Sequence, residues 1–432
     1  MKLKLLIIIA LYFSLCNAAQ AQSKLKAIKA GRLVDVVKGT VLTNQIILID
    51  NDKIVDVGPS LAIPQGAEVI DLSNATVLPG LIDCHTHLSM TPGDNYYEDI
   101  FRKTAIDKAV VAHLNTQRTL AAGFTMVRDL GGSDLIDVSL RNAINAGTIP
   151  GPRMLVATFA LSATGGHGDL TGFSPEIDWR TNKDYTGIAD GPDEIRKRVR
   201  NNVKFGADWI KIHATAGVLS EEGSAGAALY SLEEMKAAVD EAHRWGKKVA
   251  AHAHGAEGIK LAVLAGVTSI EHGSLLDDED IKLMKKNGTW LVSDIYDDDY
   301  ILSEYAKKGY PAKIIEKERS VGKLQRENFQ KAVKAGVKVA YGTDAAVYPH
   351  GWNAKQFFYM VKFGLTPMQA IQSATLNAAD LLEWKDRTGS ITKGKLADIV
   401  AVEGNPLDDI TILEKVKFVM KEGSVYKNEM AK

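Results

Sequence analysis

Cysteine is scarce in this sequence, because 432 residues contain only Cys16 and Cys84. Two cysteines are too few for a disulfide-stapled scaffold, so stability must come from an apolar core. A strong charge of either sign is also missing, since the formal net charge is −1. That balance gives no indication of nucleic acid or an anionic membrane surface as a partner. No long polar or low-complexity stretch is present, which argues against disorder.

The one uninterrupted apolar run near the N-terminus is too short for a membrane span. Lys2 and Lys4 precede this run at 5–15, and the sequence AQA follows at 19–21. This order is typical of a secretory signal peptide, so we expect residues 1–21 to be removed and the protein to be periplasmic or secreted. The alternative is an N-terminal anchor. A bilayer needs about 20 apolar residues, so no stable span is expected after cleavage.

Both ends of the remaining chain read as short strands joined by tight turns. Strand-like runs lie at 28–30, 45–49, 54–57, 398–402 and 416–420. A turn is expected at 51–53. We predict that 22–78 and 391–432 come together in one small β domain, a β-sandwich.

The middle of the chain alternates short apolar strands with amphipathic helices, which is typical of parallel βα units. Helices are expected at 231–246, where Ser231 and Glu234 form a capping signal, and at 366–382. Eight candidate strands lie at 80–86, 124–129, 153–158, 207–212, 247–253, 268–272, 289–294 and 338–343. The predicted fold class is therefore α/β, a TIM-like (β/α)8 barrel at 79–390 flanked by the β domain.

Residues able to bind metal gather where these strands end, which is where the active sites of such barrels lie. They are His85, His87, Lys211, His252, His254, His272 and Asp344. His85 and His87 are two apart on an extended segment, so both imidazoles point the same way and can share one ion. Imidazole and carboxylate suit zinc and similar divalent ions. A surface or core histidine pair is the competing interpretation.

Several motifs resemble the amidohydrolase superfamily. The segment PGLIDCHTH at 79–87 is similar to its opening motif and GTD at 342–344 to its motif on strand eight. Four further segments resemble the imidazolonepropionase-like branch of this superfamily. That branch includes Xaa-Pro dipeptidases, related carboxypeptidase-like enzymes and ochratoxin-degrading amidohydrolases. The four segments are GGHGD at 165–169, VAAHAHG at 249–255, IEHG at 270–273 and GKLADIV at 394–400. The resemblance covers about 25–430 and does not specify a substrate.

The resemblance implies a binuclear site. His85 and His87 would bind the more buried of two divalent ions, with zinc the first expectation, and His252 and His272 the second. Lys211, carboxylated by CO2, would bridge both. Manganese and cobalt suit the same ligands. Asp344 would bind the first ion and shuttle the proton. A buried salt-bridge lysine is the alternative for Lys211, although a lone charge in an apolar strand is costly.

Two adjacent ions lower the pKa of a bridging water and yield hydroxide near neutral pH. Asp344 can then carry the proton to the leaving amine, and a metal can stabilise the developing oxyanion. No serine or cysteine nucleophile is required, and Cys84 is expected to face the core.

Three further residues are candidates for substrate contact. His167 lies in a glycine-rich loop, where it could instead only fix the loop. Tyr230, by resemblance, would bond the scissile carbonyl or the substrate carboxylate. His254 faces the same side as His252 and is either a ligand or a supporting residue.

Four other features are interpreted as structural. His213 is expected to support the site, and Arg128 and Asp129 to form a salt-bridge pair. The acids Asp294 and 297–299 are expected in a solvated loop that could shape the pocket, and 296–327 forms a lid or an oligomer contact.

The sequence therefore predicts a metal-dependent hydrolase of peptide-like amides, a dipeptidase or carboxypeptidase-like enzyme that releases a C-terminal amino acid from dipeptides or N-acyl amino acids. The second hypothesis is a one-metal hydrolase of cyclic amides or amidines, like imidazolonepropionase or a deaminase, which Lys211 disfavours because those branches lack it. The third is a non-catalytic scaffold, which the intact ligand set disfavours. By resemblance, a homo-oligomer as large as an octamer is expected.

Overall fold

The computed structural model describes residues 25–91, 102–169, 171, 174, 186–221 and 223–430. The predicted signal peptide, including Cys16, lies outside these residues. Within them, no helix combines the length and the apolar character needed to cross a bilayer.

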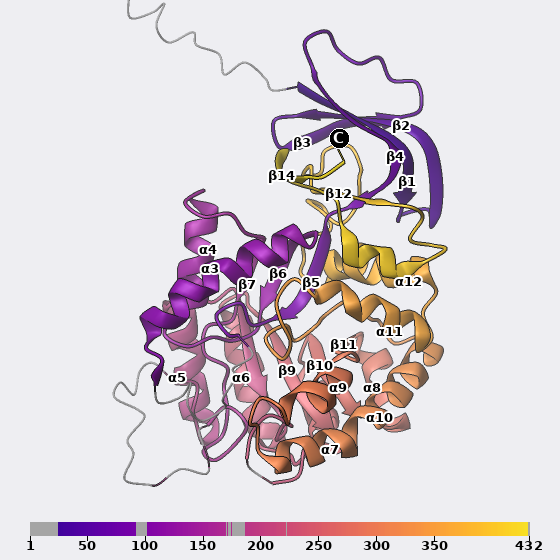
Figure 1. Cartoon of the computed structure of the whole chain (residues 1–432). Helices are drawn as coiled ribbons and strands as arrows, with labels where there is room; N and C mark the ends of the chain where they lie inside the picture. The colour runs from indigo at the N-terminus through magenta and orange to yellow at the C-terminus, as the bar shows by residue number, and fades with distance from the viewer. Residues whose placement is uncertain are drawn as a thin grey trace, which may run out of the picture.

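Strands from both chain ends form one seven-stranded sheet (Figure 1), in the order β14-β13-β12-β4-β1-β2-β3. β1 runs parallel to β4 and antiparallel to β2, while β12 pairs antiparallel with β4. The bounds are β1 Leu25–Asp35, β2 Thr40–Asp50, β3 Lys53–Gly58, β4 Glu68–Pro79, β12 Ile399–Glu403, β13 Phe418–Lys421 and β14 Ser424–Asn428. The pairing of the two ends agrees with the sequence, and Asn51 takes the left-handed turn conformation with φ 52°. The sequence analysis did not identify β4.

The middle of the chain carries two parallel sheets. One has the order β5-β6-β7 and the other β11-β10-β9-β8. The bounds are β5 Leu81–Thr86, β6 Phe124–Asp129, β7 Arg153–Val156, β8 Trp209–His213, β9 Lys248–Gly255, β10 Ser269–Leu275 and β11 Trp290–Val292. Each of these seven strands overlaps a predicted one.

Backbone bridges connect the two sheets. Leu161 bridges Ile212 at one junction. At the other junction lies the segment 338–346, which contains the predicted strand eight at 338–343 and the three residues after it. It bridges Leu291 through Val339 and Thr86 through Ala345. This segment makes single bridges and no continuous ladder. Its backbone is irregular because Asp344 has φ 48° and Ala346 has φ 137°.

Helices separate and cover these strands. Their bounds are α3 Ala105–Ala121, α4 Ile136–Asn145, α5 Gly191–Lys204, α6 Leu232–Arg244, α7 Ala256–Ala265, α8 Asp278–Asn287, α9 Asp297–Tyr300, α10 Ala312–Ala335, α11 Gln356–Lys362, α12 Pro367–Gln372 and α13 Ala378–Leu381. The predicted capping box is present, because Ser231 accepts from the Glu234 amide and Glu234 accepts from the Ser231 amide. The helix predicted at 366–382 is present, with a π-helical segment at Ser373–Asn377 between α12 and α13.

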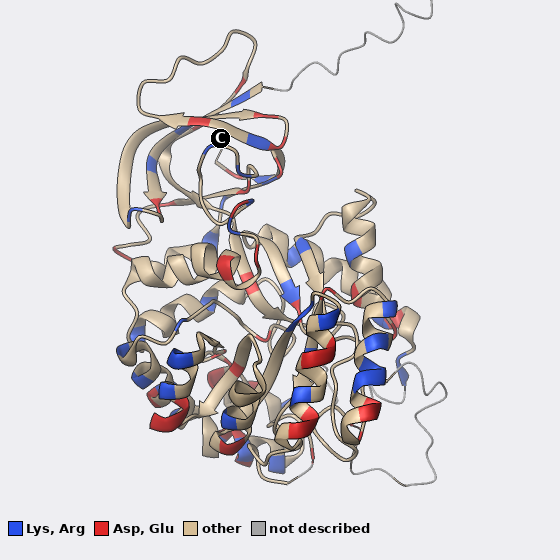
Figure 2. Cartoon of the chain, turned by 180° about the vertical axis from the view of Figure 1, so that it is seen from behind, with Lys and Arg blue, Asp and Glu red and all other residues tan. Residues whose placement is uncertain are grey.

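Positive and negative side chains are mixed on the outer helices, as Figure 2 shows for one side of the molecule. The inner faces of these helices pack on the strands in one large apolar cluster that includes Ile210, Val249, Ile270 and Leu291. This rigid packing fixes the strand ends, and the polar side chains at those ends form the candidate site.

Candidate metal centre

Potential ligands converge at the strand ends in three overlapping groups, one of which, His272, Asp294 and Asp344, shares a member with each of the other two. His85 on β5 and His87 just after it form one group with Asp344. The Nε2 atoms of His85 and His87 lie 3.3 and 3.1 Å from Asp344 Oδ1. His252, His254 and His272 form a second group, and within each group the ligand atoms lie within 4.8 Å of one another. The rings of His85 and His272 are 5.2 Å apart, so the two groups adjoin.

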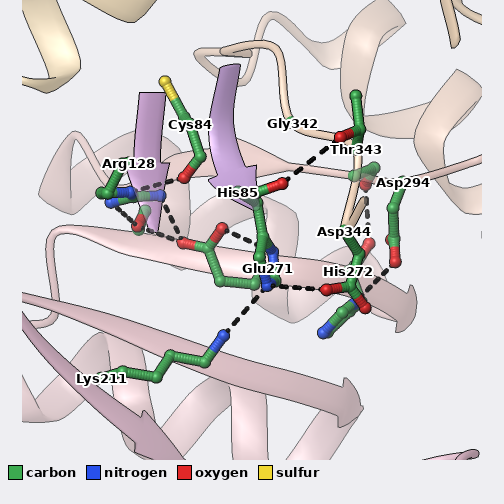
Figure 3. Close-up of polar contacts among 12 residues, drawn as sticks. Cys84, His85, Arg128, Lys211, Glu271, His272, Asp294, Gly342, Thr343 and Asp344 are labelled. Atoms are coloured by element: carbon green, nitrogen blue, oxygen red, sulfur yellow. Dashed lines mark hydrogen bonds and ion pairs between the residues drawn. The ribbon is translucent and has the colours of Figure 1, made fainter. Parts of the chain in front are cut away.

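Most of these imidazoles are held through Nδ1. His87 Nδ1 lies 2.7 Å from the Gly131 carbonyl oxygen. His254 and His272 use Nδ1 in the same way, at 2.7 Å from Ser274 Oγ and from Asp294 Oδ2 respectively. Figure 3 shows His272 beside Asp294 and Asp344. Such contacts fix the ring orientation and leave Nε2 to face a ligand.

Lys211 lies at the first group. Its side chain is 1% exposed, and its Nζ lies 3.3 Å from His85 Nε2 (Figure 3). Burial lowers the pKa of Lys211 to about 8, against the opposing effect of Glu271. An appreciable fraction of neutral amine therefore exists near neutral pH, and only the neutral amine can react with CO2.

The protonation states suit cation binding. Burial, followed by Lys211, lowers the pKa of His85 to about 4. Burial and neighbouring histidines lower the pKa of His252 and His254 well below the usual value. Burial acts to raise the pKa of Asp344, but His85 and His87 outweigh it and hold that pKa well below its usual range. His85, His252 and His254 are therefore neutral beside the ionised Asp344 carboxylate. Burial acts to lower the pKa of His87 as well, but Asp344 outweighs it and raises that pKa.

Glu271 and Arg128 form the base of the site. Glu271 Oε2 lies 3.2 Å from His85 Nδ1, and Glu271 Oε1 accepts from Arg128 Nη2 at 2.9 Å. Both side chains are 0% exposed. The predicted Arg128–Asp129 pair is wrong. Successive strand residues face opposite ways, so Asp129 instead accepts from the Leu88 amide.

Two of the candidate ligands have a strained backbone. His272 has φ 67° and Asp344 has φ 48°, a left-handed conformation that residues other than glycine rarely adopt. Such conformations cost about 1–3 kcal/mol each and persist where the surrounding structure enforces them, often at functional sites.

A cavity opens beside these ligands, lined by His252, His254, His272 and Asp344. His167 lies in its wall and stacks on His252, with ring centroids 4.3 Å apart. His167 Nδ1 lies 2.5 Å from Ser220 Oγ. His213 packs edge-on against His167 at 5.0 Å. The predicted loop histidine is thus brought to the site, and His254 joins the same cluster.

Tyr230 and Cys84 are directed elsewhere. The Tyr230 hydroxyl donates to the Ala189 carbonyl at 3.1 Å, and its ring belongs to the large apolar cluster rather than to the cavity wall. This favours a structural role, and substrate contact by Tyr230 stays a prediction. Cys84 is fully buried in an apolar cluster, and in Figure 3 its sulfur points away from His85.

The prediction that Asp294 and 297–299 lie in a solvated loop is wrong for three of these four acids. Asp294, Asp297 and Asp298 are only 5, 5 and 7% exposed. They are buried because α10 packs across α9. At Gly322 the two segments are so close that a Cβ would lie 2.2 Å from Asp298 Oδ1. The segment 296–327 therefore forms one wall of the cavity.

The sequence analysis assigned no role to Glu271 and did not identify Asp294 as the partner of His272. Glu271 had a detectable signal, since it is an acidic residue inside the predicted strand 268–272, next to the candidate ligand His272.

The match to known proteins is extensive. The model of the amidohydrolase family matches residues 76–426. The chain belongs to this family. The ochratoxinase of Aspergillus niger is 33% identical over 434 residues, which cover 95% of this chain and 88% of the relative. The imidazolonepropionase of Treponema denticola is 25% identical over 421 residues, covering 88% of this chain and 94% of the relative.

A crystal structure of a Xaa-Pro dipeptidase with bound methionine in the active site is also similar. It is 41% identical with a TM-score of 0.89, and the match covers 94% of this chain and all of that one. The superfamily and branch predicted from the motifs are confirmed. The chain is a family member with the mixed α/β fold of these enzymes, and its relatives support amide hydrolysis.

Proposed function

We propose that this amidohydrolase is a binuclear metal hydrolase of peptide-like amide bonds, dipeptidase- or carboxypeptidase-like, which releases a C-terminal amino acid from dipeptides or N-acyl amino acids. One observation carries the proposal. A buried lysine, Lys211, lies with its Nζ 3.3 Å from His85 Nε2, at the edge of a cluster of candidate histidine ligands. The similarity to a Xaa-Pro dipeptidase and to ochratoxinase supports the same reaction class.

The residues present fit metal ions. His252 Nε2 is buried and has no hydrogen-bond partner among the described residues, and Asp344 Oδ1 faces the Nε2 atoms of His85 and His87 as ligands of one ion would. A ligand at these atoms would remove that cost. We assign His85, His87 and Asp344 to the first ion and His252 and His272 to the second, with carboxylated Lys211 between them. When bound, two divalent ions, zinc first among them, would supply an activated water and polarise the scissile carbonyl.

The chain's own side chains perform the remaining steps. Asp344 is ionised and sits against the ligands, so it can take the proton of the attacking water at its carboxylate and give it to the leaving amine. His167 and His254 line the cavity beside His252, where they can orient the substrate. Residues of α9 and α10 wall one side of the cavity, and this wall would limit the directions from which bulk water reaches the reacting bond.

The wider architecture follows from the same assignment. We infer that 79–390 is a (β/α)8 barrel, which the inter-sheet bridges support. The ends, 22–78 and 391–432, would form the β-sandwich domain around the seven-stranded sheet. The leader at 1–21 supports an exported enzyme that cleaves small peptides or N-acyl amino acids, and we expect a homo-oligomer.

The one-metal alternative, hydrolysis of cyclic amides or amidines, is retained as the second candidate because of the similarity to an imidazolonepropionase. Lys211 weighs against it. A buried lysine 3.3 Å from a ligand histidine has no obvious use in a site with a single ion.

Elemental analysis of the purified mature protein tests the proposal first. About two divalent ions per chain, together with hydrolysis of dipeptides or N-acyl amino acids, would support it. One ion, with activity on cyclic amidines, would favour the alternative. If the protein binds none after incubation with metal and bicarbonate, the proposal fails.

A further inference from the structure

The cavity wall formed by α9 and α10 carries two buried acids that the proposed reaction does not use. Asp297 on α9 and Glu318 on α10 both line the cavity, and they are 5% and 4% exposed. On α10, Glu318, Val321 and Gln325 follow helical spacing, so one face of this helix looks into the cavity.

Neither acid has a cationic partner, unlike its neighbours. Asp298 and Asp299 both pair with Arg326 at 2.9 Å. By contrast, the Asp297 side chain meets only another acid, Asp294, and its Oδ1 is buried without a hydrogen-bond partner within the part of the chain that the structure describes. The one cation that lowers the pKa of Glu318 among the main influences on it is Arg326, which already pairs with Asp298 and Asp299. The charges that act most strongly on Asp297 are those of Asp294, Asp344 and Glu318, which are all negative. This wall is therefore electrostatically incomplete.

A further metal ion is a poor occupant. The described acids Asp294, Asp297 and Glu318 do not form a group whose ligand atoms lie within 4.8 Å of one another, whereas the histidine groups do. An organic ammonium tolerates wider spacing, because it offers three donors on a flexible chain. Apolar side chains, among them Val218, Leu219 and Ile301, line the same cavity and suit the body of such a molecule.

We propose that Asp297 and Glu318 bind a protonated amine of the substrate, so that the enzyme prefers amides carrying an ammonium group over neutral N-acyl amino acids. The inference rests on the proposed function, because it places the amide at the histidines and the amine at the acids. The amine is either the α-ammonium of a free dipeptide or the ammonium of a lysine side chain. Burial, then the neighbouring acids, raises the pKa of Asp297 well above its usual value, as expected for an acid without its cation.

Two matched substrate pairs distinguish the sources. L-Ala-L-Leu differs from N-propionyl-L-leucine only by the α-amine, and N-propionyl-L-lysine differs from N-propionyl-L-norleucine only by the side-chain amine. At least one cationic member should be hydrolysed with about tenfold higher kcat/KM or more, the worth of one hydrogen bond to a charged group. A preference in the first pair identifies the α-ammonium, and one in the second pair identifies the side chain.

Asp297→Asn and Glu318→Gln should each reduce that preference, while kcat/KM for the neutral member and the metal content stay unchanged. Asp299→Asn is the matched control, since this acid belongs to the same run but pairs with Arg326. Hydrolysis of all four compounds without preference would overturn the inference and leave the proposed function standing.

If none is hydrolysed, the proposed function fails, and calorimetric binding of the same four compounds decides the inference alone. Tighter binding of a cationic member that Asp297→Asn abolishes would support it. Equal binding within both pairs would overturn it.

Discussion

Glu271 contacts the Nδ1 side of the His85 ring, with Glu271 Oε2 3.2 Å from His85 Nδ1, and its Oε1 accepts a hydrogen bond from Arg128. Burial acts to raise the pKa of Glu271, but Arg128 and His85 outweigh it and lower the pKa to about 2. A permanent negative charge therefore fixes a candidate ligand whose other nitrogen faces Asp344 and Lys211.

Glu271→Gln should weaken metal binding by about 10–100-fold, as for other residues that orient ligands. It should also lower the free energy of unfolding by about 3–5 kcal/mol, because Arg128 stays buried without its counter-charge. Chelator competition and urea unfolding measure the two effects. Glu279→Gln, at an exposed partner of Lys260, is the control. Unchanged metal affinity would show that Glu271 is only structural.

Asp344→Asn should reduce kcat by about 100-fold or more while the protein stays folded, since the amide cannot accept the proton. Steady-state kinetics at saturating metal and a thermal melt measure this. Activity within about tenfold of the parent would remove Asp344 from the proton shuttle.

Lys211→Ala should lower the metal content below that of the parent and abolish most activity, because the bridging carbamate is lost. Short carboxylic acids supplied with metal should partly restore both. The same acids added to the parent are the control. Undiminished activity in the variant would exclude a carboxylated lysine.

Tyr230→Phe should lower the free energy of unfolding by about 1 kcal/mol, since the hydroxyl donates to the Ala189 carbonyl. We expect kcat/KM to change by less than about threefold, because the lost hydrogen bond lies outside the cavity and affects the reaction only indirectly. A larger loss of kcat without loss of stability would instead indicate contact with the substrate.

Asp280 should make folding stability depend on pH. Burial raises its pKa in the folded protein to about 7 from the usual 3.8. Between these pH values the Asp280 carboxyl keeps its proton in the folded protein and releases it in the unfolded chain. The stability that the neutral, buried Asp280 contributes is therefore fully present below pH 3.8 and is lost as pH rises toward 7. Asp280→Asn should therefore melt higher relative to the parent at pH 8 than at about pH 5. Asp278→Asn, at an exposed neighbour, should show no such change.

Local patterns in the sequence were enough to predict much of the architecture. Strand periodicity located β5 to β11, and the Ser231 and Glu234 pair located the start of α6, because these signals depend on neighbouring residues alone. The ligand candidates followed from their positions at strand ends, since the ends of parallel strands meet at one edge.

Only the tertiary structure decided which distant groups meet and which charges are buried. Arg128 was expected to pair with Asp129 and instead pairs with Glu271, which follows it by 143 residues. Asp297 was expected in a solvated loop, but it is buried under α10. Tyr230 was expected to contact the substrate, but its hydroxyl donates to the Ala189 carbonyl. Burial and long-range proximity arise from packing of the whole chain, and no local pattern encodes them. The sequence by itself therefore determined the family, the strands β5 to β11 and the ligand candidates, while packing decided the electrostatics that give each side chain its role.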